Sequence, residues 1–150
     1  MGGGAGDRYP DAVSRRVLFI CAHNSARSQM AEGMLRAWGG PEWDAHSAGV
    51  ESTFVRLEAI EVMDEIGIDI NDQQSKTLER YIGQRWDFVI PVCEEGAAAC
   101  PMIPGSHVIE RWQFDDPSQA SGTDDQRLAV FRRVRDEIAS RVRDFLARHP

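Results

Sequence analysis

The stretch RRVLFICAHNSARSQMAEGML, residues 15–35, carries the pattern on which the fold depends. Residues 15–22 form a continuous apolar run, which is typical of a short strand buried on both faces of a sheet. From residue 27 to residue 38 apolar side chains recur at helical spacing, and Gly-Gly-Pro follows them. The stretch therefore predicts a buried strand, a tight loop and an amphipathic helix in immediate succession.

The loop between this strand and this helix contains the residue types of an anion site. Cys21 ends the strand and Arg27 begins the helix, and between them lie five residues: Ala22, His23, Asn24, Ser25 and Ala26. Loop N–H groups and the positive end of a helix dipole attract an oxyanion, and an arginine can donate two hydrogen bonds to it. We expect Cys21 to be a thiolate in this field, with the Ser28 hydroxyl donating to its sulfur. The competing interpretation is a buried, inert cysteine at a strand end.

Two other loop residues are expected to shape the site. No fixed partner for His23 is visible in the sequence, so we expect it to influence the shape of the loop rather than to transfer protons. Asn24 tolerates left-handed backbone geometry, and its amide can tie the loop together.

Strand and helix patterns alternate along the rest of the chain. Further strands are predicted within residues 42–49, 86–92 and 106–112, and helices within residues 54–67 and 123–149, with a short helix after the loop that starts at residue 68. This alternation predicts one α/β domain, residues 15–150, with a parallel sheet covered on both faces, after a flexible Gly-rich leader, residues 1–14. Because Pro91 cannot donate a ladder hydrogen bond, the third strand should end near Ile90 or become irregular there.

Composition narrows the class of protein. A formal net charge of −7 over 150 residues argues against a general binder of nucleic acid or of anionic membranes. No apolar segment reaches membrane-span length, and no signal-peptide core is visible. The odd number of cysteines, Cys21, Cys93 and Cys100, favours free thiols in a cytoplasmic protein.

The motifs around Cys21 resemble a known family. The pattern C-x5-R-S directly after the first strand resembles the low-molecular-weight tyrosine phosphatases, and NSARSQMAEG (residues 24–33) with SAGVE (residues 47–51) resembles the thioredoxin-coupled arsenate reductases built on that fold. The similarity continues through IDI, CPM, FDDP and RVRDEI and covers residues 16–146. It implies a three-layer α/β fold with a four-stranded parallel sheet in the order 2-1-3-4 and helices on both faces.

The resemblance also implies a reaction. Arsenate has the shape and charge of phosphate and would bind in the loop, with phosphate or sulfate as analogues. Cys21 would attack the arsenic atom, Cys93 would attack the Cys21 sulfur so that arsenite leaves, and Cys100 would resolve the resulting disulfide. Thioredoxin would reduce the final Cys93–Cys100 disulfide of this monomeric enzyme. No tightly bound cofactor and no metal are expected.

A general acid is implied by the same resemblance. Asp116 in QFDDPS matches the family's proton donor, and we expect Asp115 and the bound oxyanion to raise its pKa. Arg111 and Gln113 depart from the His-Trp-Gly-Phe pattern of relatives, which puts the position of this acid loop in question.

Some relatives hold a potassium ion beside the loop, and this chain departs from their pattern. Asn24, Glu32 and Ser47 match three of the ligands, but Gln74 and Lys76 stand where threonine and aspartate are found. Like-charge repulsion would exclude a cation next to Lys76, so we expect its ammonium to occupy the cation's position and to pair with Glu32. A solvated surface lysine is the alternative.

Two other functions remain open. A phosphatase would hydrolyse phosphate monoesters through a phosphocysteine at Cys21 and would leave Cys93 and Cys100 idle. A non-catalytic thiol module would instead bind zinc or arsenite through the three sulfurs, although Arg27 beside such a metal would be unfavourable. Glutaredoxin or a small thiol could also replace thioredoxin as the electron donor.

Overall fold

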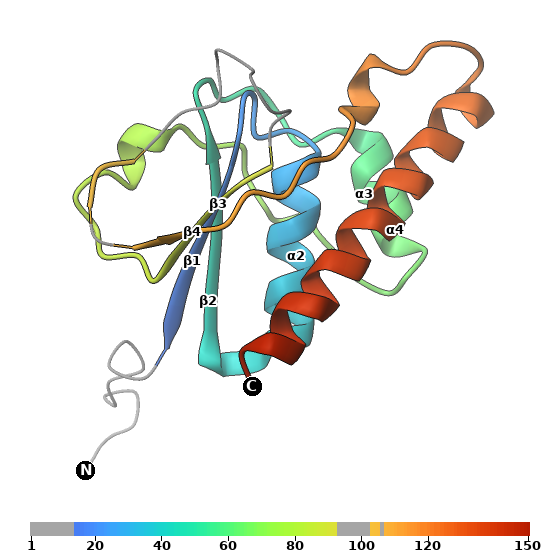
Figure 1. Cartoon of the computed structure of the whole chain (residues 1–150). Helices are drawn as coiled ribbons and strands as arrows, with labels where there is room; N and C mark the ends of the chain where they lie inside the picture. Colours follow the sequence, from blue (N-terminus) through green and yellow to red (C-terminus); the bar gives the residue numbers. More distant parts are fainter. Residues whose placement is uncertain (1–13, 93–102, 106) are drawn as a thin grey trace.

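The computed structural model describes residues 14–92, 103–105 and 107–150, which form a layered α/β structure (Figure 1). Of the predicted leader, only Ser14 lies within the described residues. The elements are, in chain order, β1 (Arg15–Cys21), α2 (Arg27–Gly39), η2 (Gly40–Glu42), β2 (Trp43–Gly49), α3 (Leu57–Asp64), η3 (Leu78–Arg80), β3 (Phe88–Pro91), β4 (Val108–Ile109), η4 (Pro117–Gln119) and α4 (Asp124–Arg148). Within the described ranges, no helix is long and apolar enough to cross a membrane.

The sheet has four strands in the order β2-β1-β3-β4, and all neighbouring pairs are parallel. This confirms the predicted order 2-1-3-4. The central strand β1 is the most deeply buried, and its residues 17–20 are fully shielded from solvent. Its apolar run therefore reflects burial on both faces, as the sequence indicated.

The two faces of the sheet are covered differently. The helices α2, α3 and α4 pack on one face, where Val17 and Phe19 of β1 join their apolar side chains in one core cluster (Figure 1). On the other face, Leu18 and Ile20 meet a smaller cluster that includes Tyr81 and Trp86. In the described part of that face, the short 3-10 helix η3 stands where the sequence predicted a short helix after residue 68.

A local signal marks the start of α4, whereas a tertiary contact lies at the start of α3. A capping box joins Thr123 and Gln126 at the start of α4, as expected from the threonine before the two acids. Helix α3 starts at Leu57, three residues later than residue 54. The reason is a tertiary contact: the Arg56 N–H donates to Ser25 O at 3.0 Å, which keeps the preceding residues extended along the Cys21 loop.

The predicted irregularity at Pro91 is a strand end. β3 stops at Pro91, and the next N–H, that of Val92, donates to Ile20 O of β1 at 2.8 Å. The N–H that proline lacks therefore faces the β4 side, where β4 has already ended at Ile109. β3 and Val92 thus end at the same end of the sheet as Cys21.

Candidate active site

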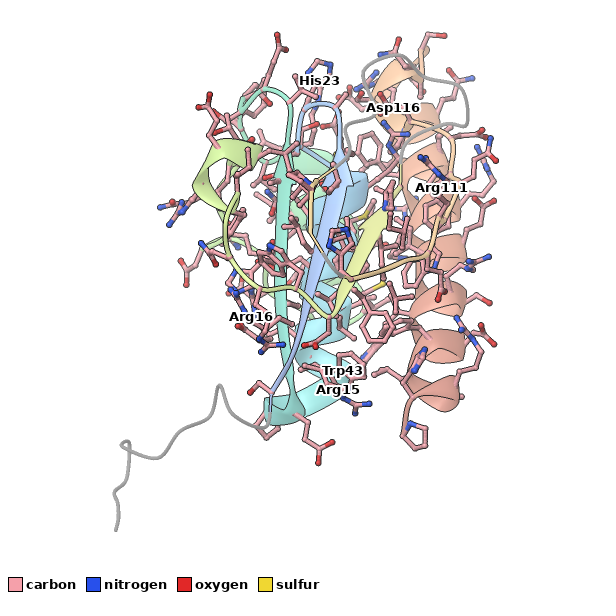
Figure 2. The ribbon with its side chains drawn as sticks, turned by 60° about the vertical axis from the view of Figure 1, so that its left-hand side comes forward. Arg15, Arg16, His23, Trp43, Arg111 and Asp116 are labelled. Atoms are coloured by element: carbon pink, nitrogen blue, oxygen red, sulfur yellow. The ribbon has the colours of Figure 1, made fainter. Side chains whose placement is uncertain are left out.

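The predicted catalytic residues that the structure describes gather at the carboxyl end of the parallel strands. In Figure 2, His23 and Asp116 lie at one end of the sheet, whereas Arg15, Arg16 and Trp43 lie at the opposite end. Ligands of open α/β sheets bind at the carboxyl end. The two segments that supply His23 and Asp116 are far apart in sequence, and the sheet brings them together.

The Cys21 loop is held against its neighbours by the backbone. The carbonyl of Ala22 accepts from Glu51 N at 3.1 Å, and that of His23 accepts from Ser75 Oγ at 3.1 Å. Gly49 allows this close approach, because a Cβ at this position would lie 2.8 Å from both Cys21 O and Ala22 O. The loop is therefore fixed by the end of β2 and by the segments that follow it.

The Cys21 sulfur accepts hydrogen bonds from the loop that surrounds it. The side chain is buried, with 3% of the residue exposed. Asn24 N donates to Sγ at 3.2 Å, and Ser28 Oγ lies 2.8 Å from Sγ. Because Asn24 Nδ2 already donates to Ser28 Oγ at 2.8 Å, the hydroxyl hydrogen of Ser28 is available to the sulfur. Both contacts stabilise a negative charge on sulfur.

Other N–H groups of the loop are available for a ligand. Within the part of the chain that the structure describes, no acceptor bonds to the backbone N–H groups of four loop residues: His23, Ser25, Ala26 and Arg27. They belong to the loop and to the first turn of α2, where N–H groups are unpaired by geometry. Such a set of donors at a helix start can bind a tetrahedral oxyanion.

Asn24 connects the loop to the rest of the site. It is fully buried and has φ of 52°, the left-handed conformation expected for it. Its Oδ1 accepts from Gln29 Nε2 at 2.8 Å and from Lys76 N at 2.7 Å, while its Nδ2 donates to Ser47 Oγ at 2.9 Å. No sequence pattern assigned a role to Gln29, although it lies in the first turn of α2 next to Ser28.

Arg27 joins the loop to the acid loop. Its side chain is 8% exposed, and Nη1 donates to Phe114 O at 3.2 Å and to Val92 O at 3.5 Å. Its Nη2 lies 3.6 Å from Asp116 Oδ2. The guanidinium therefore lies between the nucleophile loop, the end of β3 and the proposed acid.

The pKa of the Asp116 carboxyl is lower than that of an ordinary aspartate, whereas the sequence predicts a raised pKa. Burial raises the pKa of its carboxyl, but hydrogen bonds from Ser118 and the charge of Arg27 outweigh burial, and the pKa lies below the ordinary value of 3.8. The expectation that Asp115 raises this pKa is wrong for the free protein, because the Asp115 carboxylate turns to Arg133 on α4 at 3.1 Å.

The acid loop is anchored by its apolar residues. Trp112 and Phe114 are buried, and the Trp112 ring packs against Phe19 with centroids 5.5 Å apart. Arg111 and Gln113, which depart from the family pattern, are exposed. These two departures therefore face outward and leave the anchoring residues in place.

The predicted contact between Lys76 and Glu32 is present. Lys76 is buried, and its Nζ lies 3.5 Å from Glu32 Oε1. The same Nζ donates to Gln74 O at 2.6 Å. Burial lowers the pKa of Lys76, and the nearby Glu32 carboxylate partly offsets the effect. Glu32 also accepts from Ser47 and Arg36. Lys76 is thus a buried member of the polar network rather than a solvated surface residue.

Other predicted residues lie apart from the sulfur or outside the described ranges. The His23 side chain is 53% exposed, and its Nδ1 lies 3.3 Å from Glu51 Oε1. His23 therefore faces Glu51 rather than the Cys21 sulfur, and this placement does not support a role in proton transfer. Cys93 and Cys100 lie outside the described residues. Among the residues that are described, no group of three or more His, Cys, Asp or Glu side chains could hold a metal ion.

Comparison with known proteins places this geometry in a family. Residues 16–149 match the low molecular weight phosphotyrosine protein phosphatase family. The chain belongs to this family. An arsenate reductase of Halalkalibacterium halodurans is 46% identical over 129 residues, which cover 86% of this chain and 93% of that protein.

Solved structures of the family agree with the fold. An arsenate reductase in the phosphate binding state superimposes with a TM-score of 0.75 at 37% identity, covering 91% of this chain and 99% of that one. A thioredoxin-dependent arsenate reductase from Corynebacterium glutamicum has a TM-score of 0.65 at 27% identity, covering 89% of this chain and 61% of that one.

Proposed function

We propose that this family member reduces arsenate to arsenite, acting as a monomer without a tightly bound cofactor and with thioredoxin as its reductant. The observation that carries the proposal is the Cys21 sulfur, which accepts from Asn24 N and lies 2.8 Å from Ser28 Oγ. Four N–H groups of the same loop have no acceptor among the described residues. The names of the relatives support arsenate as the oxyanion. One relative's name supports thioredoxin as the electron donor.

In the proposed first step, the loop amides and Arg27 bind arsenate, and the Cys21 thiolate attacks arsenic. A hydroxyl group of the arsenate leaves as water, after it takes one proton from Asp116, and an S–As(V) bond replaces the As–O bond. Ser28 stabilises the thiolate before attack, since its hydroxyl hydrogen is available to the sulfur. Arg27 neutralises charge on the oxyanion.

In the proposed second step, the Cys93 thiolate attacks the Cys21 sulfur. The S–As bond breaks, its electron pair stays on arsenic, and arsenite leaves as As(III) while a Cys21–Cys93 disulfide forms. Cys100 then attacks Cys93, which frees Cys21 and leaves a Cys93–Cys100 disulfide for thioredoxin. The proposal that Cys93 attacks before Cys100 is supported by Val92, the residue that precedes Cys93 in the chain. The Val92 carbonyl lies 3.5 Å from Arg27 Nη1, beside the Cys21 loop.

The relay can be tested by counting arsenite per protein. Cys93→Ser should release no arsenite, because nothing attacks the Cys21–arsenic adduct. Cys100→Ser should release one arsenite per protein and then stop as the Cys21–Cys93 disulfide, which peptide mass spectrometry identifies. The wild type should form one arsenite per thioredoxin oxidised. Continued turnover of either variant with thioredoxin as reductant would contradict the relay.

A phosphatase is the second candidate, favoured by the membership of the family and by a described site that needs only Cys21, Arg27 and Asp116. It would hydrolyse phosphate monoesters through a phosphocysteine at Cys21. Steady hydrolysis of an aryl phosphate by the wild type and by Cys93→Ser, with no arsenite formed from arsenate, would favour this candidate over the reductase.

We further propose that the Lys76 ammonium takes the position of the cation that some relatives bind. The contacts of Nζ with Glu32 and Gln74 support this assignment. Activity should then be equal in potassium chloride and sodium chloride at the same ionic strength. Strong activation by potassium alone would contradict it.

A further inference from the structure

The backbone N–H and the side-chain hydroxyl of Ser118 both donate hydrogen bonds to Asp116, the proposed acid. Ser118 N donates to Asp116 Oδ1 at 3.0 Å, and Ser118 Oγ donates to the same oxygen at 2.7 Å. Asp116 is the N-cap of the 3-10 helix η4, and Pro117 stands at its start. Because Pro117 limits the backbone and Ser118 binds the carboxylate, the side chain of Asp116 is fixed by its own short turn.

The two oxygens of Asp116 are consequently different. Oδ1 accepts two hydrogen bonds from Ser118, so its lone pairs are engaged by donors. Oδ2 lies 3.6 Å from Nη2 of Arg27, the residue proposed to bind the oxyanion. A proton on this carboxyl is therefore favoured on Oδ2, the oxygen that faces the substrate side.

Among the described residues, the cation that faces the Asp116 carboxyl is Arg27, whose charge disfavours a proton on Asp116 in the free protein. Arg27 forms the ion pair with Oδ2, and neighbouring Asp115 is paired with Arg133 instead. The nearby Gln119 side chain also favours the ionised form and lowers the pKa of this carboxyl. A bound oxyanion would add negative charge on the Arg27 side, which favours protonation of Asp116 when substrate is present.

We propose that Ser118 is a positioning residue, which holds Oδ1 of Asp116 as an acceptor and thereby directs the acid's proton to Oδ2 and toward the leaving oxygen. The kinetic part of this inference rests on the proposed function, whereas the placement of the proton does not. Neither the composition nor the family resemblance assigned a role to this serine.

The kinetic test compares Ser118→Ala with Ser118→Thr. In Ser118→Ala, kcat for arsenite formation should fall about tenfold with KM for arsenate changed less than about twofold, as expected for one hydrogen bond that acts on the proton donor. Ser118→Thr, which keeps a hydroxyl, should restore most of kcat. Ser121→Ala removes an exposed serine of the same loop and serves as the matched control.

The second readout does not depend on activity. The carboxyl carbon of Asp116, followed by NMR as a function of pH, should titrate at higher pH in Ser118→Ala than in the wild type, because a hydrogen bond to the ionised form is lost. Ser121→Ala should titrate like the wild type.

The outcomes separate this inference from the proposed function. An unchanged titration in Ser118→Ala, or a kcat equal to that of Ser121→Ala in an active enzyme, would overturn the role of Ser118. A shifted titration in a protein that forms no arsenite would sustain the placement of the proton and reject the proposed function.

Discussion

The nucleophile and the proposed acid are held by the fold in different ways. Cys21 and Asn24 are buried, and the loop around them receives hydrogen bonds from the segments after β2 and before η3, with Asn24 at its centre. Asp116, with a side chain 19% exposed, is held by its own turn at Ser118 and by one ion pair with Arg27. The first is a tertiary network and the second is a local turn with one distant contact.

This difference has a physical reason. A thiolate must be stabilised before substrate arrives, which requires donors fixed in advance by the surrounding structure. An acid needs only to place one proton correctly when substrate is bound. Damage to the nucleophile loop should therefore reduce both chemistry and stability, whereas damage at the acid should reduce chemistry with little loss of stability.

The largest effect is expected for Cys21→Ser. Replacing the sulfur removes the nucleophile, so arsenite formation should fall by more than about a thousandfold. Because the hydroxyl keeps most of the shape, the thermal unfolding temperature should stay within a few degrees of the wild type. Arsenite release and calorimetry check the two parts. Retained turnover would show that another thiol starts the reaction.

Arg27→Lys should have the next largest effect, because the guanidinium links the two regions. A lysine cannot donate in a fork to the oxyanion or reach both Phe114 O and Asp116. We expect kcat/KM for arsenate to fall about a hundredfold, as for loss of one transition-state donor. Arg85→Lys, an exposed arginine, is the control and should change nothing. Equal kinetics in the two variants would remove Arg27 from the site.

The comparison also explains what the sequence could predict. The alternation of strands and helices, the capping of α4 and the Cys21–Arg27 loop follow from patterns that are local in sequence, and the structure agrees with them. The strand order was implied by the family resemblance, and the structure confirms it. The delayed start of α3 depends on the bond between Arg56 and Ser25, which no local pattern contains.

The missed features are of two kinds. The effect of Asp115 was misjudged because its partner Arg133 lies 18 residues away on another element. Ser118, in contrast, was within reach of sequence reasoning, since an aspartate commonly bonds to the backbone two residues later. Gln29 bonds to Gln74 O across the loop, a contact that requires the folded chain.

Asn24 gives a direct measure of the nucleophile network. Asn24→Ala removes side-chain bonds to Ser28, Ser47, Gln29 and Lys76 N, so the free energy of unfolding should fall by about 2–4 kcal/mol. Asn24→Gly loses the same bonds but accepts φ of 52° without strain, so it should be about 1 kcal/mol more stable than Asn24→Ala. Urea unfolding of the pair separates hydrogen bonding from backbone strain. If Asn24→Ala and Asn24→Gly were both as stable as the wild type, the hydrogen bonds of Asn24 would not stabilise the fold.

The smallest effect is expected at the acid, and its pH dependence has a defined sign. Ionisation of Asp116 is favoured in the folded protein, because its pKa lies below the unfolded value near 3.8. Its contribution to stability is therefore present above pH 3.8 and is lost as the pH falls through the lowered pKa. Asp116→Asn should be less stable than the wild type by under about 1 kcal/mol at pH 7, and the gap should close at the acid end of the titration. The destabilisation by Asn24→Ala should persist over the same range, since its bonds involve no proton uptake. Urea unfolding at several pH values checks both, and a gap for Asp116→Asn that widens toward low pH would reverse the sign of the Asp116 shift.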